Sequence, residues 1–272
     1  MKFDNVMKLL QHLDGQEYEL FKTVLTEFCN ECLLDDLSSF DALNMMSLKD
    51  FTELVGKDNF NTVIVCAVEF FLSNEYSVDG KSWNAIDFLL QKKDIRLSPA
   101  DRAYLEGLKN SYMGLYEVTD VVANKTITLR EVLEPKNRPI VVKEKSATHC
   151  VSLSTLLGAR IVNVGKNNLL AGGCFLLSPT VAKEAGENIK AISGVMMQKD
   201  KLRLYQDFTK DPVLMVKKMF VKELAQAWLL GAMAENAADA QTDDEEGIEN
   251  EEGTEEGIKP PLTHHKRGHT IH

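Results

Sequence analysis

Hydrophobic residues in the first 113 positions recur at the spacing of amphipathic helices. The first such set is Val6, Leu9, Leu10 and Leu13. A second set runs from Leu20 to Cys32, and residues 60–73 are apolar on most sides, which is typical of a helix at the centre of a bundle. Residues 1–113 are therefore predicted to form a helical domain.

Two serines mark predicted helix starts in this domain. Ser47 is followed by an acidic residue at the third helical position, a pattern typical of an N-cap. Ser98 is followed by Pro99 and Asp101, which adds proline at the first helical position. A further helix is predicted over residues 83–91.

From residue 114 the spacing of hydrophobic residues changes from the helical period to the alternation typical of β-strands. The predicted strands are 116–122, 125–132, 140–143, 159–164 and 169–177. Short strands joined by turns predict a small five-stranded antiparallel unit over residues 114–179, curved into a barrel of the OB or SH3 type. An open sheet capped by helices is the alternative. Gly172 and Gly173, inside the last strand, predict a bulge or the close approach of another group.

Helical signals return after the strands. Pro179 and Pro212 each follow a capping residue, so residues 180–238 are predicted to form C-terminal helices that pack on the core. Residues 239–272 form an acidic, histidine-containing tail that is expected to be disordered, because it has few apolar residues to bury. The fold class is α+β. The lack of a closing element leaves open that the chain is a truncated form of a longer protein.

Several sequence segments of the middle region resemble those of other proteins. They are Leu97 to Leu105, Tyr116-Glu117-Val118, Ile127 to Leu133, Lys143 to Thr148, Ala159 to Val162 and Ala171-Gly172-Gly173. Over residues 85–180 the chain resembles a recurring bacterial module of uncharacterised proteins, some of which also carry a SEC-C-type zinc motif. The resemblance implies no established activity. The SEC-C motif is absent from this chain, so neither a metal role nor a translocase-type partner is implied.

The net charge of −10 is unevenly distributed along the chain. Residues 114–179 carry five acids and eight bases, a net charge of +3, whereas residues 1–113 carry 19 acids and 11 bases, a net charge of −8. Residues 239–272 carry ten acids and three bases, a net charge of −7. Acidic segments at both ends argue against non-specific nucleic-acid binding. A contact in which the tail screens the basic middle is a further hypothesis.

Candidate binding residues are the cations on or beside the predicted strands. They are Lys125, Arg130, Lys143, Lys145, Arg160 and Lys166. If several converge on one face, they could hold a single nucleic-acid strand, with Tyr116 or Phe175 stacking on bases. The competing interpretation is an ordinary solvated surface, which the small excess of positive charge favours.

Catalytic and metal-binding motifs are not recognisable. Cys29 and Cys32 form a C-x-x-C pair in a helical pattern without a second pair of ligands, so a structural role is expected. His149 and Cys150 are neighbours, and adjacent residues of an extended chain point in opposite directions. The glycines match no phosphate-binding loop. No catalytic residue, metal or cofactor is therefore expected.

These patterns predict a protein of the cytoplasm without a signal peptide or membrane segment. The expected function is a non-enzymatic binding or adaptor module that acts through the β-unit. The alternatives are a nucleic-acid-associated accessory protein and an enzyme of unrecognised chemistry. A protein partner is favoured over nucleic acid, and the oligomeric state is left open.

Overall fold

The computed structural model describes residues 3–33, 46–206 and 209–248. The chain divides into two units, Met1–Met233 and Ala234–His272. The first unit holds the helices and strands discussed below. The second contains the rest of the last helix as far as Ile248, and residues 249–272, most of the predicted tail, lie outside the described part.

Four helices open the first unit, as the hydrophobic spacing predicts. They are α1 (Phe3–Leu10), α2 (Gly15–Glu31), α3 (Leu48–Val55) and α4 (Lys57–Ser73). The Ser47 hydroxyl accepts a hydrogen bond from the Asp50 N–H and caps α3, which confirms that predicted start. α4 is the central helix, since Val63, Ala67 and Phe71 along it are fully buried.

A hairpin that the sequence pattern did not predict follows α4. It consists of β1 (Glu75–Val78) and β2 (Lys81–Asn84), joined by Asp79-Gly80 with positive φ at both residues, as a tight hairpin turn requires. The predicted helix over 83–91 therefore begins too early, because Trp83 lies in β2 and helix α5 is Ala85–Gln91, capped by the Asn84 side chain. Helix α6 (Pro99–Lys109) begins at the predicted Ser98 cap.

The next five strands form a closed barrel. They are β3 (Met113–Val122), β4 (Thr126–Glu131), β5 (Ile140–Lys143), β6 (Leu156–Val164) and β7 (Asn167–Leu177), in the order β3-β4-β5-β7-β6. β6 pairs with β3 to close the barrel. The prediction of a purely antiparallel unit is wrong, because β5 and β7 run parallel. This order, with the third and fifth strands side by side, is that of an OB-type barrel.

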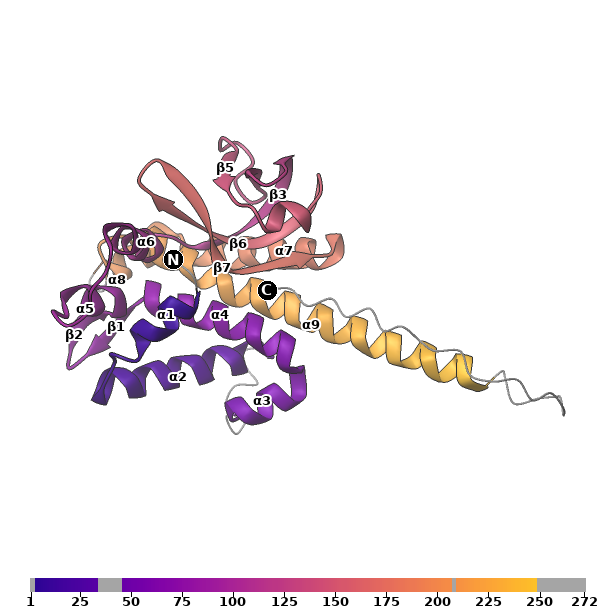
Figure 1. Ribbon diagram of the computed structural model, residues 1–272, viewed down its shortest axis with the longest axis horizontal. Helices are drawn as coiled ribbons and strands as arrows, with labels where there is room; N and C mark the ends of the chain where they lie inside the picture. Colours follow the sequence, from indigo (N-terminus) through magenta and orange to yellow (C-terminus); the bar gives the residue numbers. More distant parts are fainter. Residues whose placement is uncertain (1–2, 34–45, 207–208, 249–272) are drawn as a thin grey trace. The chain divides into compact units, whose positions relative to one another are not determined.

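The barrel has its own core and shares a second one with the helices. Val118, Ile127, Leu129, Val142 and Leu157 fill the interior. On the opposite side of β6 and β7, residues such as Val162 and Phe175 join the main core of the helices. Figure 1 shows α4 beneath the barrel, beside the strands that it packs against. One side of the barrel is thus covered by helices. The face of β3, β4 and β5, on the other side, is left without this cover.

The C-terminal helices are α7 (Pro179–Met196), α8 (Lys199–Tyr205) and α9 (Pro212–Ile248). The ring of Trp228 on α9 stacks on Phe175 of β7 at 5.4 Å between centroids, which fixes this helix to the barrel. α9 continues past residue 239, where the pattern predicts the tail to begin. The helix ends at Ile248.

Candidate functional site

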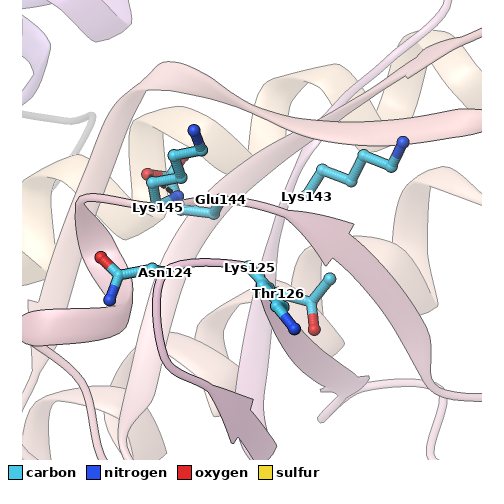
Figure 2. A pocket seen from close by; sticks show the side chains of 6 residues that line it. All are labelled: Asn124, Lys125, Thr126, Lys143, Glu144 and Lys145. Carbon is cyan, nitrogen blue, oxygen red and sulfur yellow. Dashed lines mark hydrogen bonds between the residues drawn. The ribbon is translucent and has the colours of Figure 1, made fainter.

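Three of the six predicted cations line one hollow of the barrel. Lys125, Lys143 and Lys145 surround a space of about 430 Å³ together with Asn124, Thr126 and Glu144 (Figure 2). The other three, Arg130, Arg160 and Lys166, are not among its lining residues. The hollow lies where the β3–β4 turn meets the end of β5.

The backbone at the hollow is fixed by sheet pairing and by the turn. Asn124 has a φ of 60°, which lets the chain reverse between β3 and β4, and the Lys125 N–H donates to the Val122 carbonyl at 3.0 Å. Thr126 pairs with Lys143 across β4 and β5, so their side chains share a face. The lysines therefore project from a rigid scaffold.

A short segment after β5 is also tied to this turn. The Thr148 hydroxyl accepts a hydrogen bond from the Asn124 N–H at 3.0 Å and donates to the Lys145 carbonyl at 2.6 Å. His149 Nε2 lies 2.8 Å from Asn124 Oδ1. The His149 ring is thus engaged with an amide, and Cys150 is an exposed free thiol.

The three lysines form no ion pair with any described carboxylate. In Figure 2 their ammonium groups stand apart, with Lys143 and Lys145 extending upward and the Nζ of Lys125 below them. Glu144 is the one acidic residue of the lining, and its Oε1 accepts three backbone N–H groups instead. The hollow thus presents unpaired positive charge.

The other predicted cations have different surroundings. Arg130 lies on the outer face of β4 with Nη1 3.9 Å from Glu117 Oε2, an exposed ion pair. Lys166 is exposed in the β6–β7 turn beside Gly165, whose φ is 63°. Neither residue contributes to the hollow.

Arg160 is not a surface cation, contrary to its place in the predicted set. Its side chain is fully buried, with Nε 3.5 Å from Glu69 Oε2 on α4. Its Nη1 donates to the Ser73 hydroxyl at 3.1 Å and to the Ser111 carbonyl at 3.0 Å. The bulge of β6 between Ala159 and Ile161 accompanies this inward orientation. Alternation alone could not reveal it, because a bulge breaks the alternation.

The Glu69 carboxylate binds the backbone of the paired glycines of β7. Its Oε1 accepts hydrogen bonds from the N–H groups of Gly172 and Gly173 at 2.7 and 3.2 Å. A Cβ on Gly173 would lie 2.9 Å from the Cys66 Sγ, so only glycine fits against α4. The predicted close approach at this pair is therefore confirmed.

Burial opposes the charged forms of this cluster. It raises the pKa of Glu69, an effect that the Arg160 guanidinium and the two glycine N–H groups counteract. Burial also lowers the pKa of Arg160 and lowers the pKa of Lys218, on α9, to about 8. The Lys218 ammonium donates to the Ser73 carbonyl at the end of α4. The cluster joins α4, the barrel and α9, and no single-element pattern in the sequence predicts it.

A second polar cluster fixes the β4–β5 loop to α9. The Tyr112 hydroxyl donates to Glu131 Oε1 at 2.9 Å, and Lys217 pairs with Glu134. Burial raises the pKa of Tyr112 further from neutrality, and the Lys217 ammonium lowers the pKa of Glu134. These groups bond to one another, which is consistent with a structural role for the cluster.

The aromatic residues that the sequence suggested as stacking partners are in the cores. Tyr116 and Phe175 are both buried. The outward-facing residues of β4 and β5 are Thr126, Thr128, Arg130, Val141 and Lys143. The face beside the hollow therefore offers no ring for base stacking, and the predicted use of Tyr116 or Phe175 is wrong.

The cysteine pair also belongs to a core. Cys29 and Cys32 are fully buried in and just after α2, and burial raises the pKa of the Cys29 thiol to about 12. Within the described ranges, no group of three or more His, Cys, Asp or Glu side chains is placed to hold a metal ion. Among the described helices, none combines the length and apolar character needed to cross a membrane.

The comparison with known proteins identifies a family. The model of a family of unknown function (DUF7986) matches residues 14–204, which include helices α2 to α6, the whole barrel and α7. An association with SEC-C proteins, which the resemblance suggested, is not part of this match. No curated protein and no solved structure matches the chain.

Proposed function

The chain belongs to DUF7986, a family of unknown function, and we propose that it is a non-enzymatic binding module whose barrel holds an acidic segment of a protein partner. The observation that carries this proposal is the hollow of Lys125, Lys143 and Lys145, whose ammonium groups have no described carboxylate partner. Unpaired charges on a rigid scaffold attract a ligand of opposite charge and steer its approach.

The position of the hollow in the barrel supports the proposal by analogy. OB-type barrels bind ligands on the face of their second and third strands and at the loop between the first two. Here these elements are β4, β5 and the β3–β4 turn, of which the turn carries Lys125 and β5 carries Lys143, while Lys145 follows β5 in the chain. The analogy concerns the place of binding, and the ligand is argued from the residues.

The composition of this face favours a protein segment over nucleic acid. Binding of single strands relies on aromatic rings that stack on bases, and the outward positions of β4 and β5 carry none. Exposed Val122 and Val141 instead offer apolar contacts close to the lysines.

We also propose a cytoplasmic location. All five cysteines, Cys29, Cys32, Cys66, Cys150 and Cys174, are free thiols. Unpaired cysteines are typical of proteins that fold in a reducing compartment.

Binding of two polyanions to the full-length protein tests the partner class. The protein is titrated with poly-L-glutamate and with a single-stranded oligonucleotide of similar charge, and calorimetry measures both affinities. Poly-L-glutamate should bind more tightly than the oligonucleotide, and its affinity should fall as salt is added. Tighter binding of the oligonucleotide would instead support the nucleic-acid alternative. No binding of either polyanion at low salt would overturn the proposal.

A further inference from the structure

Glu144 holds an unusual position, because it is an acid between the lysines of a basic hollow. Its Oε1 accepts hydrogen bonds from the N–H groups of Lys145, Ser146 and Ala147 at 2.8, 2.7 and 3.2 Å. Its own N–H donates to the Lys125 carbonyl at 3.1 Å, which ties the residue to the β3–β4 turn. The carboxylate is thereby fixed in the lining of the hollow rather than free in solvent.

This arrangement occupies three backbone donors, that of Lys145, which lines the hollow, and those of Ser146 and Ala147, which follow it in the chain. Successive N–H groups that converge on one point form a strong position for an oxygen anion, and here the chain supplies that anion itself. The Glu144 carboxylate also forms no ion pair within 4.0 Å with any described lysine, so it does not neutralise one directly. The hollow therefore combines an occupied anion position with three free ammonium groups.

From this geometry we infer that Glu144 determines the specificity of the hollow by excluding compact anions, such as phosphate groups, in favour of an extended chain of carboxylates. The inference deepens the proposed function and rests on it. A compact polyphosphate needs donors that converge on one place, and Glu144 holds these donors and repels a second anion beside them. A flexible acidic peptide can instead place separate carboxylates against the separate ammonium groups of Lys125, Lys143 and Lys145.

The test compares two probes on three forms of the full-length protein. The probes are poly-L-glutamate and inorganic tripolyphosphate, and the forms are the wild type, Glu144→Ala and Glu144→Gln. The wild type should bind poly-L-glutamate and bind tripolyphosphate at least about tenfold more weakly. Glu144→Ala should bind tripolyphosphate about tenfold more tightly than the wild type, because the negative charge between the lysines is removed and the N–H groups that Glu144 occupies become free.

Glu144→Gln separates charge from structure. Its amide oxygen can still accept the three N–H groups, so the segment keeps its conformation while the repulsion is lost. Its tripolyphosphate affinity should lie between those of the wild type and Glu144→Ala, and its melting temperature should match that of the wild type.

The outcomes distinguish this inference from the proposed function. If the wild type binds poly-L-glutamate but neither variant gains affinity for tripolyphosphate, the role of Glu144 is wrong while the proposed function stands. Equal binding of both probes by the wild type would also overturn the role of Glu144. If the wild type does not bind poly-L-glutamate, the proposed function itself fails.

Discussion

Arg160 and Lys143 lie in the same barrel but meet opposite environments. Lys143 is exposed at the end of β5, where its charge is available to a ligand. Arg160 points into the boundary between the barrel and α4, where its Nη2 has no partner among the described residues and Nε faces Glu69. A buried ion pair adds little net stability compared with apolar residues, whereas removing one member leaves an uncompensated charge. The same residue class is therefore exposed to solvent in one place and has a structural role in the other.

The first prediction concerns this buried pair. Arg160→Ala should lower the free energy of unfolding by about 3–5 kcal/mol, because Glu69 is left buried without its counter-ion. The matched control is Arg130→Ala, which removes an exposed pair with Glu117 and should change stability by less than about 1 kcal/mol. Urea unfolding followed by circular dichroism measures both. Similar values for the two variants would contradict the structural role of Arg160.

The second prediction concerns Lys218, whose pKa burial lowers from the ordinary value of 10.5 to about 8. Between these pH values the unfolded chain binds more protons than the folded one, so the contribution of Lys218 to stability rises with pH in this window. Arg160 and Lys109 also lower this pKa, while Glu75 and Asp211 raise it.

Lys218→Met removes this titration. The free energy of unfolding of the wild type should therefore rise relative to that of Lys218→Met as pH increases from about 8 to about 9.5, within the window set by the two pKa values. Urea unfolding of both proteins at each pH measures the difference, in which the shared titration of other groups cancels. A difference that stays constant or falls with pH would refute the assignment.

At the scale of elements, close packing between helix α6 and strand β6 positions the barrel on the helical layer. A Cβ on Gly107 of α6 would lie 2.3 Å from the carbonyl oxygen of Asn163 on β6. The approach leaves no room for any side chain. The contact is between backbones, so it cannot relax by a change of rotamer.

The third prediction follows from this contact. Gly107→Ala should destabilise the protein by about 1–3 kcal/mol or more, because α6 must move away from β6. Gly194→Ala is the control, since a Cβ at this exposed position of α7 meets nothing within 4 Å. It should stabilise the protein by about 0.5–1 kcal/mol through helix propensity. Thermal unfolding of both variants measures these two stability changes, which should have opposite signs. If Gly194→Ala destabilised the protein and Gly107→Ala did not, the close packing of α6 on β6 would be contradicted.

Elements with strong local signals were predictable from the sequence, and contacts between elements were not. The Ser47 and Ser98 caps and the five barrel strands follow from residues close together in the chain. The β1–β2 hairpin was missed although Asp79-Gly80 marks its turn, because its two short strands contain Val78 as their single aliphatic residue, so they lack the apolar pattern that marks β5. The parallel pairing of β5 with β7 depends on how the barrel closes, which strand periodicity does not encode.

The candidate site was partly predictable for the same reason. The cations could be selected by sequence position, but their separation into surface and buried sets depends on which strands and helices meet. The hollow joins a turn and a strand end that are 18 residues apart, Lys125 and Lys143. Glu69, the partner of Arg160, lies in a different element. In the sequence, only the apolar run around Glu69 indicates that this acid is buried.

At the scale of the whole molecule, the basic hollow belongs to a protein with a net charge of −10. The overall charge repels acidic ligands at long range, so binding must depend on the local field of the lysines. Salt screens both effects over about 10 Å at 0.1 M ionic strength. Affinity for an acidic ligand should therefore depend on where the positive charges lie more than on how many the chain carries.

Poly-L-glutamate binding by two triple variants of equal charge tests this central claim most directly. Lys125→Ala/Lys143→Ala/Lys145→Ala removes the charges of the hollow, and Lys183→Ala/Lys190→Ala/Lys201→Ala removes three exposed lysines from α7 and α8. The first variant should lose about threefold or more in affinity at low salt, since three exposed ion pairs of ~0.2–1 kcal/mol each contribute ~0.6–3 kcal/mol together, while the second stays close to the wild type. Equal losses in the two variants, or no loss in the first, would contradict the account of the hollow as the binding site.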